Sequence, residues 1–207
     1  MSKNLLDYLL PKNKYGDNLN CYFDINEVAN SVIKIKKIDN FTVFYLFSYQ
    51  DPWVKEMFVD IKLKSNYSII PDLYKVFEAQ LLTKVINNST DLLIGVPTDS
   101  KRYIKRGFGL IEEMLILSTQ SGYNVDNLFY KKLSTINRSK LNKTQRMLIT
   151  NNYDFVDLDK LKCLNNCQQL FIFDDVITTG STFLECAYKL QKNVGESIPI
   201  FGVMIAG

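Results

Sequence analysis

The strongest constraint on the fold is an alternation of short apolar runs and helix-like segments from residue 91 onward. Continuous apolar runs of this length are typical of parallel strands that are covered on both faces of a sheet. The runs that predict such strands are 91–97, 127–133, 169–175 and 198–206. Apolar residues at helical spacing predict helices at 107–120 and after residue 181. This alternation predicts an α/β fold with a parallel sheet flanked by helices.

The first part of the chain has a different pattern. Residues 41–49 are rich in aromatic and β-branched side chains, which predicts a strand. The Asp-Pro pair at 51–52 is typical of a helix start, and apolar spacing predicts a second helix over 72–86. Residues 1–40 show only weak patterning, so we treat them as an N-terminal extension of uncertain structure. The remaining residues, 41–207, are expected to form one domain.

Composition excludes several classes of protein. The chain contains no histidine, which rules out Ser-His-Asp hydrolases, histidine-based zinc catalysis and histidine general bases. The formal net charge of +3 gives no reason by itself to expect a polyanionic partner. Four cysteines are too few for a disulfide framework, and neither a signal peptide nor a run of membrane-spanning length is legible. We therefore expect a cytoplasmic protein with reduced thiols and no membrane insertion.

The most specific motif is the segment 171–183. An apolar strand ends in two acids, Asp174 and Asp175, and a hydroxyl-rich turn follows before the next helix. The turn consists of Thr178, Thr179, Gly180, Ser181 and Thr182. Such a turn alone is usually only a helix cap. Its backbone N–H groups, hydroxyls and helix dipole also suit a phosphate monoester, whereas two carboxylates suit the hydroxyls of an attached sugar.

This segment resembles the phosphoribosyl-pyrophosphate (PRPP) loop of type I phosphoribosyltransferases. The resemblance implies that Asp174 and Asp175, the candidate catalytic residues, bind the ribose 2′ and 3′ hydroxyls, and that 178–182 surround the 5′-phosphate. In the family's reaction, a nucleophile attacks the anomeric carbon of the ribose and magnesium pyrophosphate leaves. The implied cofactor is therefore Mg²⁺ bound together with PRPP, with no direct protein ligand assigned.

Other segments resemble the competence ComF family within this group. The resemblance covers about residues 45–207 and includes Val96-Pro97, the Arg106-Gly107-Phe108 triplet and a helical segment, 54–66, that contains Lys62. It implies a pyrophosphate loop made of Pro97, Thr98, Asp99, Ser100, Lys101 and Arg106. It also implies a mobile loop around 141–146, with Lys140, Lys143 and Arg146 as its candidate ligand-binding residues. The implied fold is that of a type I phosphoribosyltransferase with an N-terminal hood.

Two departures from the ComF pattern are visible. Many members begin with a four-cysteine zinc module, but only Cys21 lies in this part of the chain, so no zinc is expected. Cys163 and Cys167 have helical spacing, and two thiols without further ligands are more typical of packing than of metal binding. The Thr-x-x-Gln element of the family's mobile loop is not recognisable either.

The resemblance implies a PRPP-binding phosphoribosyltransferase-like enzyme that serves natural transformation, with single-stranded DNA and a helicase-like protein as partners. Six lysines and arginines and no acid lie between Asp126 and Asp154, and a local concentration of charge of this kind suits a polyphosphate or a nucleic-acid strand. A solvated basic loop would have the same composition. Two further alternatives stay open, namely a non-catalytic PRPP-sensing or DNA-binding module and a nucleobase salvage enzyme. Nothing in the sequence indicates the acceptor base.

Overall fold

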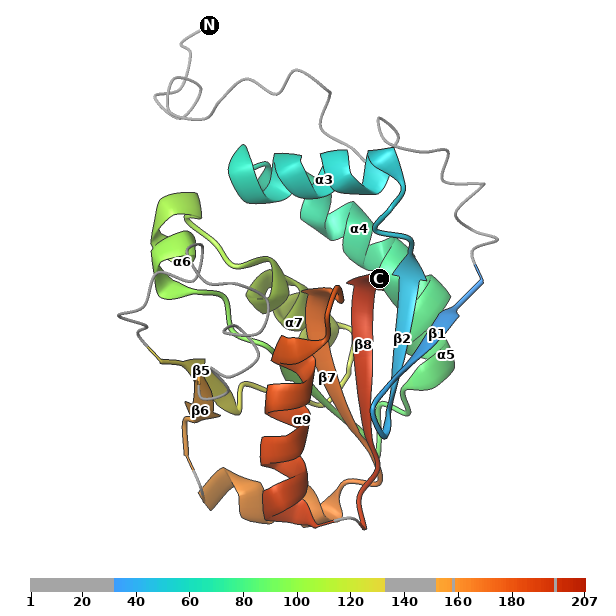
Figure 1. The fold of residues 1–207 in the computed structure, drawn as a ribbon, viewed down its shortest axis with the longest axis vertical. Coiled ribbons are helices and arrows are strands. Elements are labelled where there is room, and N and C mark those ends of the chain that lie inside the picture. The colour runs from blue at the N-terminus through green and yellow to red at the C-terminus, as the bar shows by residue number, and fades with distance from the viewer. Residues whose placement is uncertain (1–31, 133–151, 158, 196) are drawn as a thin grey trace, which may run out of the picture.

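The computed structural model describes residues 32–132, 152–157, 159–195 and 197–207. Within these residues a six-stranded sheet has the order β1-β2-β8-β7-β3-β4, and β5 and β6 form a separate two-stranded ribbon (Figure 1). Strands β2, β8, β7, β3 and β4 are parallel, whereas β1 is antiparallel to β2. The predicted α/β class with a mostly parallel sheet and flanking helices is confirmed.

The elements have the following bounds. The strands are β1 Lys34–Ile38, β2 Phe41–Phe47, β3 Leu92–Gly95, β4 Val125–Asp126, β5 Phe129–Lys131, β6 Tyr153–Phe155, β7 Leu170–Val176 and β8 Ile200–Ala206. The α-helices are α3 Pro52–Leu63, α4 Ile70–Phe77, α5 Thr83–Val85, α6 Ser100–Arg106, α7 Leu110–Gln120 and α9 Ser181–Val194. Short 3-10 segments cover Tyr67–Ile69 and Asp159–Asn166, and a π-helical segment, Glu78–Leu82, joins α4 to α5.

The core has two layers because alternate side chains of each central strand point to opposite faces of the sheet. On β7, Phe171 and Phe173 belong to the layer that also contains buried residues of α4 and α7. Leu170 and Ile172 belong to the other layer, which α9 covers. Figure 1 shows α9 on one face of the sheet and α4, α5 and α7 on the other. Burial on both faces explains why the strand sequences are almost continuously apolar.

The strand predicted at 127–133 is present only in part and is not a strand of the main sheet. Residues Phe129–Lys131 form β5, which pairs with β6 in antiparallel fashion. The edge position beside β3 is taken instead by the two residues of β4. The side chains of Phe129 and Phe155 stack at 5.0 Å and contribute to the ribbon, and Phe129 is buried in the same layer as α9. Packing against α9 therefore accounts for the separate ribbon, which a local apolar pattern does not reveal.

Two features bring the N-terminal half of the chain to the site. The first is β1, which lies within the stretch 1–40 that showed only weak patterning and adds an outer strand beside β2. The second is α3, which crosses above the carboxyl ends of the parallel strands (Figure 1). Residues 1–31 of the expected extension lie outside the described residues. No helix in the described ranges has the length and apolar character needed to cross a membrane.

Candidate functional site

The turn after β7 has a conformation that requires glycine at one position. The chain leaves the sheet at Ile177, whose N–H donates to the carbonyl of Ala206 at 2.9 Å. Gly180, the residue before α9, has φ +76°, in the left-handed region that favours glycine. A Cβ at this position would lie 2.9 Å from Cδ1 of Ile38 on β1. The conformation of the turn and the close approach of β1 therefore both depend on this glycine.

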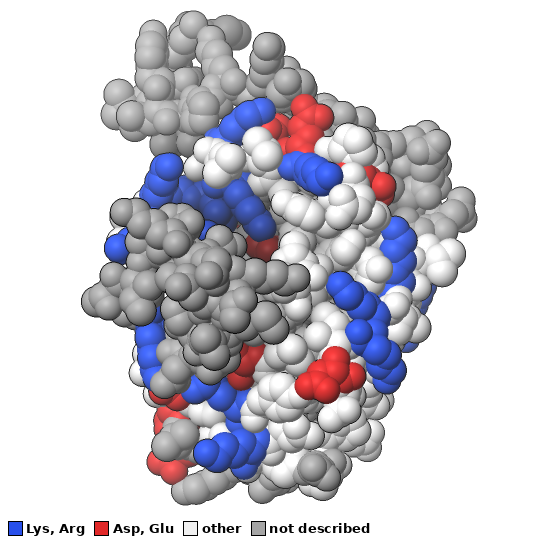
Figure 2. Space-filling model, viewed as in Figure 1, with Lys and Arg blue, Asp and Glu red and all other residues white. Residues whose placement is uncertain are grey.

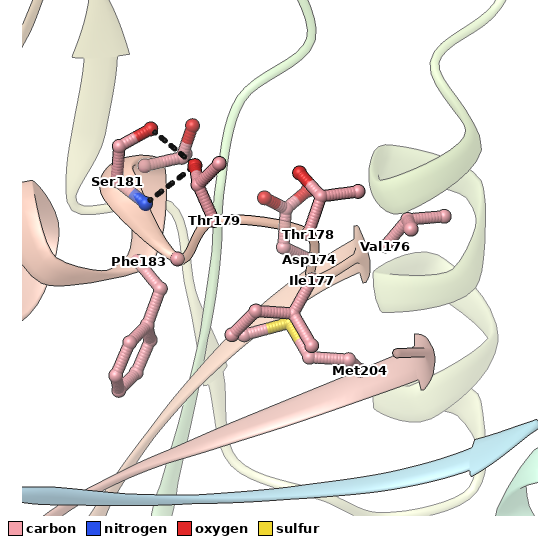
Figure 3. A pocket seen from close by; sticks show the side chains of 10 residues that line it. Asp174, Val176, Ile177, Thr178, Thr179, Ser181, Phe183 and Met204 are labelled. Carbon is pink, nitrogen blue, oxygen red and sulfur yellow. Dashed lines mark hydrogen bonds between the residues drawn. The ribbon is translucent and has the colours of Figure 1, made fainter. Parts of the chain in front are cut away.

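A small open pocket lies inside this turn (Figure 3). It is lined by Asp174, Val176, Ile177, Thr178, Thr179, Gly180, Ser181, Thr182, Phe183 and Met204. The hydroxyls of Thr179 and Ser181 are 3.2 Å apart, and the N–H of Ser181 approaches the Thr179 hydroxyl at 3.4 Å. Because the first N–H groups of a helix lack partners within it, the start of α9 offers donors beside these hydroxyls. All five residues predicted to surround a phosphate, 178–182, thus line one pocket.

Asp174 lies at the edge of this pocket, near the end of β7. One of its carboxylate oxygens accepts a hydrogen bond of 2.8 Å from the N–H of Asp175. Burial, followed by the neighbouring charge of Asp175, raises the pKa of Asp174 to about 7. The charges of Lys62 and Lys131 act in the opposite direction. Near neutral pH this carboxyl can therefore both accept and donate hydrogen bonds.

The raised pKa of Asp174 gives a prediction on stability. The ordinary value is 3.8, so the folded protein holds one more proton than the unfolded chain between about pH 4 and 7. The free energy of unfolding should therefore fall as the pH rises through this window. We expect Asp174→Asn to be more stable than the unmodified protein at pH 8 by on the order of 1–2 kcal/mol, after allowance for partial exposure. Urea unfolding at pH 5 and pH 8 tests this, and an equal difference at both pH values would contradict it.

The second acid, Asp175, is paired with a lysine from another part of the chain. The Nζ atom of Lys62, on α3, lies 2.6 Å from a carboxylate oxygen of Asp175 and 4.6 Å from the centre of the Phe58 ring. Arg106, at the end of α6, donates from Nε to the backbone carbonyl of Lys62 at 3.2 Å. Its guanidinium lies 5.7 Å from the centre of the Phe108 ring. Three separate segments of the ComF resemblance therefore meet at the carboxyl edge of the sheet.

The turn predicted to bind pyrophosphate follows β3 at the same edge and is held by contacts within the chain. The carboxylate of Asp99 accepts from the N–H of Lys101 at 3.1 Å and pairs with Lys131 at 3.4 Å. Burial alone would raise the pKa of Asp99, but the charge of Lys131 and the nearby N–H groups outweigh it and lower the pKa. Both the N–H and the hydroxyl of Thr98 donate to Glu112 on α7. The turn is thus close to the pocket, with several of its polar groups already engaged.

Two residues attach the β5–β6 ribbon to the site, namely Glu185, which the sequence did not single out, and Lys131, which the sequence indicated only as one of six clustered basic residues. Glu185, on α9, accepts hydrogen bonds from the backbone N–H and side-chain amide of Asn152 and from the N–H of Tyr153. Lys131, on β5, lies 5.7 Å from the Tyr153 ring and bridges to Asp99. Burial raises the pKa of Tyr153, with a smaller contribution from the charge of Asp174. Glu185 belongs to no local motif, and the basic cluster does not indicate the partners of Lys131, so only the tertiary structure reveals the positions of both residues.

The remaining predicted residues divide into two groups. Lys101 is exposed on α6 together with Arg102 and Lys105, and Figure 2 shows basic side chains gathered around this helix. Lys140, Lys143 and Arg146, the candidate mobile-loop residues, lie outside the described residues, as does Cys21. The side chain of Cys163 is not described either.

The acids at the pocket offer the hard oxygen donors that Mg²⁺ prefers. Asp174 and Asp175 are adjacent, but Asp175 is already paired with Lys62. No group of three or more metal-ligating side chains occurs in the described ranges. Asp174 and Asp175 are thus the two acids of the described site that could contribute oxygen ligands to a bound Mg²⁺.

The comparisons with known proteins add no family or relative. No protein-family model matches the chain, and no curated protein matches it. The arguments on function therefore depend on the residues and their arrangement.

Proposed function

We propose that the chain binds PRPP, or a related ribose 5-phosphate compound, together with Mg²⁺, and acts as a phosphoribosyltransferase of the ComF type. The observation that carries this proposal is the pocket lined by Asp174, residues 176–183 and Met204, in which the Asp174 carboxyl group and the N-terminal turn of α9 line the same hollow. A phosphate ester of a sugar needs both kinds of group, namely N–H and hydroxyl donors for the phosphate and acceptors for the sugar hydroxyls.

In this proposal each part of the pocket has a separate role. Residues 178–182 hold the 5′-phosphate, while Asp174 and Asp175 accept hydrogen bonds from the ribose hydroxyls. Lys62, 2.6 Å from Asp175, and Lys131, 3.4 Å from Asp99, supply positive charge near the sugar and the pyrophosphate. When bound with PRPP, Mg²⁺ supplies charge neutralisation for the leaving pyrophosphate.

Catalysis would then depend on orientation and fixed charge. The pocket holds the ribose so that its anomeric carbon faces an acceptor. The translational and rotational entropy of the substrate is therefore lost when it binds, and not in the chemical step. Positive charge develops on the ribose ring as the bond to pyrophosphate breaks, and in this proposal the carboxylates of Asp174 and Asp175 stabilise it. No covalent intermediate on the protein is needed.

The proposal is tested with a single hydroxyl in the turn. We expect Thr179→Val to weaken the binding of ribose 5-phosphate about ten-fold, because a hydrogen bond to a charged phosphate contributes ~1.5–3 kcal/mol. Thr83→Val is a matched control, because Thr83 is an exposed threonine on α5 whose hydroxyl bonds only to the carbonyl of Ala79 among the interactions described. Titration calorimetry measures both affinities. Failure of the unmodified protein to bind ribose 5-phosphate and PRPP, or equal losses in the two variants, would contradict the proposal.

The same proteins decide between the enzyme and its alternatives. Pyrophosphate release from PRPP and Mg²⁺ with a panel of nucleobases indicates a salvage enzyme if one free base is the acceptor. PRPP binding without release under any condition indicates a sensing module.

A second candidate function, the binding of single-stranded nucleic acid, is favoured by the surface of α6. Lys101, Arg102 and Lys105 are exposed there, and the Tyr103 side chain is 44% exposed. Cations combined with an accessible aromatic ring suit the backbone and bases of a single strand. Including single-stranded DNA at low salt in the same screen separates this function from the binding of PRPP, because the exposed Arg102, Tyr103 and Lys105 are assigned to the nucleic acid alone.

A further inference from the structure

The turn at Thr98 binds a carboxylate of the protein itself. The backbone N–H of Thr98 donates to Oε1 of Glu112 at 2.7 Å, and its hydroxyl donates to Oε2 at 2.8 Å. Glu112 lies in the first turn of α7, and both residues are partly exposed. The two oxygens of one carboxylate thus occupy two donors of one residue, which is the arrangement that an external anion would adopt at this turn.

The position of Glu112 depends on a second residue, Gly109. A Cβ at position 109 would lie 1.9 Å from Oε2 of Glu112 and 2.9 Å from the Thr98 hydroxyl oxygen. Real Cβ atoms do not approach other atoms so closely, so the carboxylate fits only because residue 109 has no side chain. The local structure therefore has room for the Glu112 carboxylate against Thr98.

Among the residues that the structure describes, no lysine or arginine forms an ion pair with this carboxylate. Lys131, on β5, is bridged to Asp99 of the turn at 3.4 Å. Burial lowers the pKa of Arg106, and the charge of Glu112 partly opposes this effect, so the two side chains are near each other. The Nε atom of Arg106, however, donates to the carbonyl of Lys62. A phosphate group brought to the Thr98 donors would therefore meet the negative charge of Glu112 at short range. Like charges at such a separation repel strongly in a partly buried site.

We propose that Glu112 competes with pyrophosphate for the Thr98 donors and so determines how tightly this half of the site holds its ligand. The inference rests on the proposed function, which assigns pyrophosphate to the turn at 97–100. Binding of pyrophosphate requires the Glu112 carboxylate to leave Thr98, and its return assists release of the product. Release is a step that limits turnover in many enzymes, so a competing group inside the protein has a direct use. The ribose-phosphate half of the site, at 174–183, is unaffected by this competition.

The test removes one negative charge with almost no change in shape. We expect Glu112→Gln to bind pyrophosphate about ten-fold more tightly than the unmodified protein in the presence of EDTA, because the charge repulsion is lost. Glu113→Gln is the matched control. Glu113 is the next residue of α7, and its carboxylate accepts from the Tyr67 hydroxyl at 2.9 Å instead of from Thr98. Its affinity for pyrophosphate should stay within about two-fold of the unmodified protein.

Unchanged or weaker pyrophosphate binding by a folded Glu112→Gln protein would overturn the inference, because a glutamate that only positions the turn predicts that result. A second measurement needs no variant. On addition of pyrophosphate to the unmodified protein, the amide resonance of Thr98 should shift, and an unaltered resonance at saturation would also overturn the inference. Ribose 5-phosphate titrated into the same proteins distinguishes the two failures. If the unmodified protein, Glu112→Gln and Glu113→Gln bind ribose 5-phosphate equally, the proposed function is retained. If none of the three binds ribose 5-phosphate, the proposed function itself is contradicted.

Discussion

Replacement of both Asp174 and Asp175 by asparagine is expected to weaken the binding of PRPP and ribose 5-phosphate by about a hundred-fold or more. At pH 8, where Asp174 is mostly ionised, each carboxylate is proposed to accept a hydrogen bond from a ribose hydroxyl, and each such charge-assisted bond contributes ~1.5–3 kcal/mol. Asparagine has almost the same shape, so the fold should persist. In the unmodified protein Lys62 lies 2.6 Å from the Asp175 carboxylate, and the double variant removes this charged partner. Titration calorimetry in the presence of Mg²⁺ measures the change.

Asp126→Asn provides a control for this double variant. Asp126 also ends a parallel strand at the carboxyl edge of the sheet, and it pairs with Lys160 at 2.8 Å. Unlike Asp174, it does not line the pocket, and unlike Asp175, it does not pair with Lys62. We expect its affinity for ribose 5-phosphate to be unchanged, because the loss of an exposed ion pair has little effect at a distance. If the double variant bound PRPP and ribose 5-phosphate as tightly as the unmodified protein, the proposal that the two acids bind the ribose would be wrong.

Truncation of Phe173 should have the largest effect on stability. Phe173 is fully buried on β7, one residue before Asp174, and its ring stacks on that of Phe77 on α4 at 5.1 Å. We expect Phe173→Ala to lower the free energy of unfolding by about 3–5 kcal/mol, because it removes a large apolar side chain and leaves a cavity. Tyr103→Ala, which truncates an aromatic side chain that is 44% exposed, should cost less than about 1 kcal/mol.

Chemical denaturation measures both changes. If Phe173→Ala and Tyr103→Ala had similar effects, the packing between the sheet and α4 would not be the main support of the strand that carries the acids. The comparison therefore tests the two-layer core directly, independently of any ligand.

The central part of the fold could be predicted because its strands are covered on both faces. Strands β3 and β8 and the first four residues of β7 are almost entirely apolar for this reason, and each strand was expected from its sequence. The outer strand β1 has the sequence KIKKI, and it becomes a strand through its pairing with β2. The ribbon strand β5 has a clear local pattern, but the pattern does not identify its partner, β6, which lies beyond an intervening segment of the chain.

The site, like the fold, could be predicted where it is made of residues that are neighbours in the sequence. The turn 178–182 is a contiguous segment, so the sequence alone indicates that it offers hydroxyl and backbone N–H donors. The contact of Lys62 with Asp175 joins residues far apart in the chain, and that of Glu185 with Tyr153 crosses 32 positions. Even the contact of Glu112 with Thr98, across 14 positions, joins two different elements. A sequence pattern specifies neighbours along the chain, whereas these pairs depend on how α3, α7 and α9 pack around the sheet.

The lysines of β1 have a consequence for association between molecules. A strand at the edge of a sheet offers unpaired backbone groups to which a strand of another molecule can add, and this is a common route to aggregation. In the described part of the chain β1 is such an edge, and Ile35 on it is 63% exposed. Lys34 and Lys37 are also exposed, and Figure 2 shows basic side chains along this side. Addition of a second copy through β1 would bring the lysines of both strands into one ribbon, where their repulsion opposes intermolecular pairing.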